Sequence, residues 1–245
     1  MSSTPIPTAS PAAVGFCPER LNRLDDAMQK EIEAGHYVGI TVMVARHGRL
    51  AKFGSYGYQT LESPAPLRED AIFRIASMTK PIIAAAMMTL YEEGKWQLDD
   101  PVTAFVPEFA DLKVLVDDEL VPLDRPMTMR HLMATCAGFA FVVPLGSTNP
   151  ELDKMYAAAD LFSGDNEDLI AKLAKLPLEA QPGTLFRYGL QQEIQGVIIQ
   201  RLSGQPLDAF LQRRIFGPLT RWTQALASRR RTGTASRLGT RSTRT

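Results

Sequence analysis

Ser77 and Lys80 stand three residues apart in the stretch FRIASMTKPIIAAAMMTLYEEGK, at the head of an apolar run with helical character. A serine hydroxyl becomes a useful nucleophile only when a neighbouring group takes its proton. Residues i and i+3 share a helix face, so the Lys80 amine is predicted to reach back toward the Ser77 Oγ. The pair therefore predicts acyl transfer with Ser77 as nucleophile and Lys80 as its proton acceptor.

The setting of the pair favours this chemistry, although the four letters alone do not establish it. Pro81 is tolerated only near the first turn of a helix, which places the helix start close to Ser77. The N-terminal helix field and burial by Ile75, Met78, Ile82 and Ile83 would both lower the pKa of Lys80. The alternative is an ordinary helix cap beside an exposed lysine, which the bare S-x-x-K spacing does not exclude.

Several elements must position this pair. Leu21, Leu24, Met28 and Ile32 recur at helical spacing between Pro18 and Gly35. Residues 38–45 and 50–58 read as two strands of a hairpin with its turn at 46–48. Further helices are expected after Thr128 and at 166–176, 190–202 and 207–215, and residues 140–165 are expected to be mostly loop. An isolated hairpin is marginal, so this sheet calls for additional strands.

Four blocks of sequence in order resemble the serine β-lactamase-like superfamily, most closely its family VIII carboxylesterases. They are FRIASMTK with its helix, LDDPVTAFVPEF, MTMRHLMATCAGF, and PGTLFRYGLQQEIQGVIIQRLSGQPLDAFLQRRIFGPL. The resemblance covers about Val14 to Leu219. It implies an α/β (α+β) fold of the β-lactamase/transpeptidase type, in which helices flank an antiparallel sheet beside a helical subdomain.

The resemblance also implies catalytic roles. Ser77 would form the acyl-enzyme, and Lys80 would accept its proton or hold the network in place. Tyr188, in PGTLFRYGL, matches the family's catalytic tyrosine and would share the proton transfer and then activate water. Without the family pattern, a core tyrosine with a bonded hydroxyl is the commoner interpretation of Tyr188. No cofactor or metal is implied.

Two positions depart from the family pattern. Leu190 replaces the asparagine that usually follows the tyrosine by two residues, which favours small esters over amide-bearing substrates. Residues 135–138, Thr-Cys-Ala-Gly, replace a His-Thr-Ser-Gly core, which we interpret as altered packing. Cys136 is a poor candidate nucleophile because no histidine is placed to activate it.

The resemblance ends at Leu219, before the three strands and the third motif that the family's chain normally adds. That part also supplies one of the two oxyanion-hole N–H groups. Residues 220–245 instead hold seven arginines and no acidic residue, and we interpret them as a disordered or out-of-frame tail. Residues 1–13 are expected to be a disordered leader, residues 14–80 to hold the helix, the hairpin and the start of the nucleophile helix, and residues 81–219 to be mainly helical. A chain lacking those strands is expected to be unstable or to aggregate, with little turnover.

Composition excludes several other classes. Residues 1–219 carry a net charge of −7, so nucleic-acid binding by the body is not expected. The N-terminus lacks the features of a signal peptide and no run is long enough to span a bilayer, which predicts a cytoplasmic protein. The sequence thus predicts a serine hydrolase of small esters. A β-lactamase or DD-peptidase, a non-catalytic acyl-ligand binder or interaction protein, and a nucleic-acid binder acting through the Arg-rich tail are the alternatives.

Overall fold

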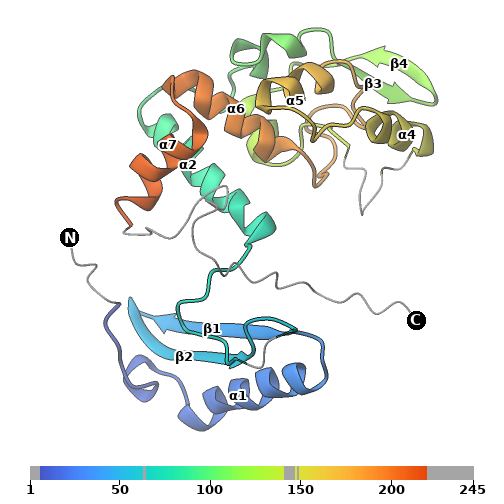
Figure 1. The fold of residues 1–245 in the computed structure, drawn as a ribbon. Helices are drawn as coiled ribbons and strands as arrows, with labels where there is room; N and C mark the ends of the chain where they lie inside the picture. The colour runs from blue at the N-terminus through green and yellow to red at the C-terminus, as the bar shows by residue number, and fades with distance from the viewer. Residues whose placement is uncertain (1–5, 63–64, 141–146, 148, 220–245) are drawn as a thin grey trace. The chain divides into compact units, whose positions relative to one another are not determined.

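The computed structural model describes residues 6–62, 65–140, 147 and 149–219. These residues form two compact units, with the boundary between Ile75 and Ala76. Unit 1 holds the described residues up to Ile75, and unit 2 those from Ala76 to Leu219 (Figure 1).

Unit 1 is a helix packed on a β-hairpin. A short 3-10 turn, η1 (Ala12–Val14), precedes α1 (Pro18–Glu33), and strands β1 (Gly39–Arg46) and β2 (Arg49–Gly57) pair antiparallel. The turn between the strands is formed by His47 and Gly48, both with positive φ, which matches the right-handed twist of a two-residue hairpin. Asp25 of α1 binds the Lys52 Nζ of β2 at 2.6 Å. The predicted helix and hairpin are both present, within one residue at most boundaries.

The start of unit 1 corrects one expectation. The backbone N–H of Leu50 bonds the Pro7 carbonyl at 2.8 Å, and the N–H of Ala9 bonds the Leu50 carbonyl at 2.9 Å. Val14 is buried. A disordered leader over residues 1–13 is therefore too long, because residues 7–9 add to the edge of the hairpin; residues 1–5 lie outside the described part.

Unit 2 is mostly helical and contains the main hydrophobic core, whose members run from Ile83 to Phe216. Its helices are α2 (Lys80–Glu92), α3 (Met129–Met133), α4 (Pro150–Ala158), α5 (Asn166–Leu173), α6 (Gln191–Ser203) and α7 (Leu207–Leu211). Shorter turns are η2 (Ala76–Thr79), η3 (Val102–Ala104), η4 (Pro107–Phe109) and a π-helical turn, η5 (Gln212–Phe216). Strands β3 (Lys113–Val116) and β4 (Glu119–Pro122) form a second hairpin, at the opposite end of the unit from α7 (Figure 1).

Three features of unit 2 differ from the sequence expectations. The β3–β4 hairpin lies within residues expected to be mainly helical, and α4 begins at Pro150 within residues expected to be loop, with Asn149 as its cap. The last helix is divided, because α7 passes into the π-helical turn η5. Each hairpin forms its own two-stranded sheet, so neither gains a third named strand from the part of the chain that the structure describes.

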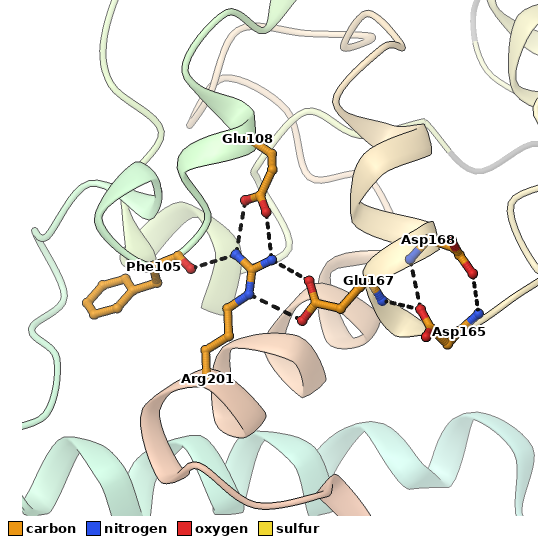
Figure 2. Close-up of polar contacts among 6 residues, drawn as sticks. All are labelled: Phe105, Glu108, Asp165, Glu167, Asp168 and Arg201. Carbon is orange, nitrogen blue, oxygen red and sulfur yellow. Dashed lines mark hydrogen bonds and ion pairs between the residues drawn. The ribbon is translucent and has the colours of Figure 1, made fainter.

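Helix α6 is the centre of unit 2. It packs against α2, α3, α5 and α7, and Ile194, Val197, Ile198 and Ile199 are fully buried. At its C-terminal end, Arg201 fastens it to two neighbouring segments (Figure 2). The guanidinium donates to the Phe105 carbonyl at 3.0 Å, to both Glu108 oxygens at 3.0 and 2.7 Å, and to Glu167 of α5 at 2.5 Å. These contacts of Arg201 hold the last turns of α6 by charge as well as by packing. Asp165 and Asp168 form a capping box at the start of α5 beside this cluster.

Candidate active site

Ser77 lies in the 3-10 turn that leads into α2. Its side chain is exposed, and Lys80, the first residue of the α-helix, is half-buried. Pro81 occupies the first turn, as predicted, where its missing N–H costs no helical hydrogen bond. Ala76, just before Ser77, has a φ of 42°, a left-handed conformation that is unfavourable for a residue with a Cβ. Such strain is found at functional sites more often than elsewhere.

The environment of Lys80 is less apolar than expected. Of the side chains predicted to shield it, Ile83 is buried, but Met78 is 68% exposed. Met78 therefore contributes little desolvation, and the chemistry of the lysine must rest on its charged and hydrogen-bonding neighbours.

Tyr188 meets Ser77 across 111 residues of sequence. The Tyr188 hydroxyl oxygen lies 2.5 Å from the Ser77 Oγ, a hydrogen bond in which either hydroxyl can donate. The Lys80 Nζ lies 4.7 Å from the centre of the Tyr188 ring. Because α2 packs on α6 and Tyr188 lies just before α6, the three residues predicted from sequence come together within unit 2.

The groups around Tyr188 lower the pKa of its phenol. The hydrogen bond with Ser77 lowers the pKa of the Tyr188 phenol below its ordinary value of 10, and the Lys80 ammonium lowers it further. Burial and the negative charge of Glu193 oppose this shift. The net effect is a lowered pKa, so the phenolate, which is the form able to take a proton from Ser77, is easier to reach than in an ordinary tyrosine.

The loop that presents Tyr188, residues 177–190, is tied to the rest of unit 2 along its length; we call it the Tyr188 loop. It begins beside β3, where the Leu178 N–H bonds the Lys113 carbonyl at 2.7 Å. The Gln181 amide then bonds the Pro122 carbonyl and the Asp124 N–H, both at 3.0 Å. The loop is consequently a fixed structure that joins the second hairpin to α6.

Residues 135–138 form the opposite wall of this loop. The carbonyls of Thr135, Cys136 and Gly138 accept from Arg187 at 3.0 Å, Gly183 at 2.8 Å and Glu179 at 2.8 Å, respectively. Gly138 has a φ of 93°, and a Cβ there would lie 2.2 Å from the Ala180 carbonyl oxygen, so only glycine fits. Residues 135–138 therefore support the Tyr188 loop through their backbone.

Two side chains near the site, Leu190 and Cys136, have structural contacts and no catalytic partner in the described part of the chain. Leu190 is 2% exposed and belongs to the hydrophobic core, so its position offers no polar group to a substrate. The Cys136 Sγ donates to the Ala134 carbonyl at 3.3 Å, and its position gives it no catalytic partner among the hydrogen bonds of the described residues.

Other kinds of site find little support in the described part of the chain. No group of three or more His, Cys, Asp and Glu side chains gathers there as a metal ion would require. The same residues contain no helix with the length and apolar character needed to cross a bilayer. A cleft of about 770 Å³ lies between η4, the second hairpin and residues 123–127, but its lining includes none of the three predicted site residues.

Sequence reasoning missed the supports of the site. Arg187, Gln191 and Glu179 hold the Tyr188 loop, and Ala76 carries the strained backbone beside Ser77. The position of Arg187 next to Tyr188 was the one available signal. The partners of these residues lie up to 52 residues away, so no local pattern could have assigned them.

Known proteins resemble this chain in both sequence and structure. The β-lactamase family model matches residues 24–240. Esterase EstB of Burkholderia gladioli is 33% identical over 199 residues, which are 80% of this chain and 49% of EstB. A putative D-alanyl-D-alanine carboxypeptidase of Salmonella agona is 30% identical over 226 residues, 87% of this chain and 49% of that protein.

The structural likeness points the same way. EstCE1, described as a hydrolase with promiscuous acyltransferase activity, superposes with a TM-score of 0.70 at 30% identity, over 82% of this chain and 51% of that one. The chain spans about half the length of the relatives it matches. Its described residues have the fold of the β-lactamase/transpeptidase type, as mixed α/β with small antiparallel sheets, and the chain belongs to the β-lactamase family.

Proposed function

We propose that this chain is a serine hydrolase that acts on small carboxylic esters through an acyl-enzyme. The observation that carries the proposal is the 2.5 Å contact between the Ser77 Oγ and the Tyr188 hydroxyl, with the Lys80 Nζ 4.7 Å from the tyrosine ring. In covalent catalysis, the nucleophile is generally hydrogen-bonded to a proton acceptor, and a third group orients that acceptor.

In the acylation step, the Ser77 Oγ attacks the ester carbonyl carbon while its proton passes to the Tyr188 phenolate. The Lys80 ammonium stabilises that phenolate before the transfer. Collapse of the tetrahedral intermediate breaks the carbonyl–alkoxy bond, and the proton on Tyr188 goes to the departing alcohol. Ser77 is then esterified, and the Tyr188 phenolate is restored.

Deacylation repeats the sequence with water. The Tyr188 phenolate takes a proton from the water while the water oxygen attacks the acyl carbon. Tyr188 then returns that proton to the Ser77 Oγ as the bond between Ser77 and the acyl group breaks. The products are a carboxylic acid and the free serine. No cofactor enters either step.

Two observations favour esters. Leu190 is withdrawn into the core, which leaves that position without an amide for a substrate amide to bond. EstB, one of the relatives, is named an esterase. The Salmonella relative is named a carboxypeptidase, which keeps a β-lactamase or DD-peptidase activity as the alternative.

The experiment is active-site labelling with a fluorophosphonate probe, followed by peptide mass spectrometry, in the whole chain and in Ser77→Ala. We expect a single adduct on Ser77 that is absent from the variant. Hydrolysis of p-nitrophenyl butyrate and of nitrocefin, compared in the same samples, separates an esterase from a β-lactamase. Binding of an acyl ligand with no labelling at Ser77 would refute the hydrolase and support a non-catalytic binder.

A further inference from the structure

The side chain immediately before Tyr188 forms an unusual ion pair. The Arg187 guanidinium bonds the Glu179 carboxylate, and the Glu179 side chain is only 1% exposed while that of Arg187 is 21% exposed. Taking two charges out of water costs so much that a buried pair is often no more stable than an apolar pair of similar volume. Stability alone therefore does not account for this pair.

The backbone on both sides of Arg187 is also held. Its N–H donates to the Thr135 carbonyl at 3.0 Å, and its carbonyl accepts from the Gln191 Nε2 at 3.1 Å. Gln191 is itself fully buried in the first turn of α6. The two peptide groups that flank the Arg187 Cα are thus each held by one hydrogen bond, and the ion pair holds the side chain between them.

The other end of Tyr188 shows what this fixing achieves. Its hydroxyl must stay within hydrogen-bonding distance of Ser77, which is held on a different segment of the unit. A displacement of about 1 Å in a reacting group can lower a rate by about 10²-fold. A loop able to shift by that amount would lose the contact.

We propose that the Glu179–Arg187 ion pair is a positioning device that holds the Tyr188 hydroxyl on Ser77. This inference rests on the proposed function, because it gives the pair a role in the proton transfer assigned to Tyr188. Within the described residues, the hydrogen bonds assigned above to Glu179 and Arg187 run to one another, to the backbone of residues 135–138 and to the Gln191 side chain, so their role is to position the loop.

The test removes the pair without leaving a buried charge. The variant Glu179→Leu with Arg187→Met replaces both groups by apolar side chains, and Arg187→Lys is a milder variant that keeps the positive charge. Arg201→Met is the matched control, because it removes a similarly buried arginine of the same unit that bonds no residue of the Tyr188 loop. Far-UV circular dichroism selects the conditions in which every variant is folded.

The first readout is the titration of the Tyr188 phenol at 295 nm, taken as the difference between each protein and the same protein with Tyr188→Phe. Within the described residues, the charges of Lys80 and Glu193 act on this phenol, and all variants keep both. We expect the Tyr188 pKa to lie below 10 in the unchanged chain and in Arg201→Met. It should rise toward 10 in the apolar pair and by a smaller amount in Arg187→Lys.

The second readout is the rate of fluorophosphonate labelling at Ser77, which should fall about 10²-fold in the apolar pair and stay unchanged in Arg201→Met. Wild-type titration in both the apolar pair and Arg187→Lys would overturn the inference, as would an equal shift in Arg201→Met. If the apolar pair does not fold, an unshifted titration in Arg187→Lys is sufficient to overturn it. If Ser77 is not labelled in the unchanged chain, the proposed function fails, whereas the phenol titration still decides the positioning role.

Discussion

Replacing Arg201 by methionine should destabilise unit 2 by an amount that the structure allows to be worked out. The substitution keeps the apolar stem of the side chain and removes the guanidinium (Figure 2). Glu108 and Glu167 are 38% and 54% exposed, so each pair is worth about 0.2–1 kcal/mol. The charged hydrogen bond to the Phe105 carbonyl adds about 1.5 kcal/mol. We expect a loss of about 2–3.5 kcal/mol in the free energy of unfolding at pH 7.

Acidity should reduce this loss. The hydrogen bonds from Arg201 lower the pKa of Glu108 below its ordinary value of 4.5. A carboxylate with a lowered pKa contributes stability that is present above its unfolded pKa and is lost as the pH falls through the folded one. The difference between wild type and Arg201→Met should therefore be full at pH 6–7 and shrink below about pH 4.

Pulse proteolysis in urea measures both quantities and needs little protein. Glu108→Gln and the double variant complete a double-mutant cycle, which isolates the coupling between the two side chains. A loss under about 0.5 kcal/mol at pH 7, or a loss that is the same at pH 3 and pH 7, would refute the account of this cluster.

Three further predictions concern the site. Tyr188→Phe should slow fluorophosphonate labelling of Ser77 by about 10²–10⁴-fold, whereas Tyr91→Phe, on α2 but outside the site, should leave the labelling rate within a factor of two or so; equal rates in all three proteins would exclude Tyr188 as proton acceptor. The labelling rate of the unchanged chain should rise with pH and level off at an apparent pKa below 10, since the lowered Tyr188 pKa favours the phenolate; a rate that is flat between pH 6 and about 10 would contradict this. Gly138→Ala should destabilise unit 2 by more than about 1 kcal/mol, measured by thermal unfolding, because the new Cβ would meet the Ala180 carbonyl; an unchanged midpoint would show that the segment can shift.

Much of the fold was open to prediction because it depends on local signals. Helix α1 follows a 3.6-residue apolar period, the first hairpin has a clear turn at His47–Gly48, and α3 begins at the capping residue Thr128. Each of these features is decided within a few residues, which is the range over which sequence patterns are informative.

The second hairpin was missed for a physical reason. Its strands are four residues long, and its turn residues, Asp117 and Asp118, have φ values of 48° and 64° without a glycine. Asp tolerates the left-handed region better than most residues, but it is a weaker signal of it than Gly. Helix α4 does have a local signal in Asn149–Pro150, a capping residue followed by a proline in the first turn.

The site was predictable in its members and not in its supports. Ser77, Lys80 and Tyr188 could be named because they stand in recognisable motifs. Their catalytic roles remain a proposal. The contacts that hold Tyr188 run from its loop to Thr135, Gln191 and Glu179, and these depend on how unit 2 packs as a whole.

The 111-residue separation between Ser77 and Tyr188 has a consequence for folding kinetics. Closing a flexible loop of that length costs about 4 kcal/mol of chain entropy, and packing of α2 on α6 must repay it before the two hydroxyls meet. Contacts so distant in sequence form slowly compared with single helices or hairpins. During refolding, Ser77 should therefore become reactive later than the helical circular dichroism signal appears. The time course of labelling at this serine would then report when unit 2 has finished folding.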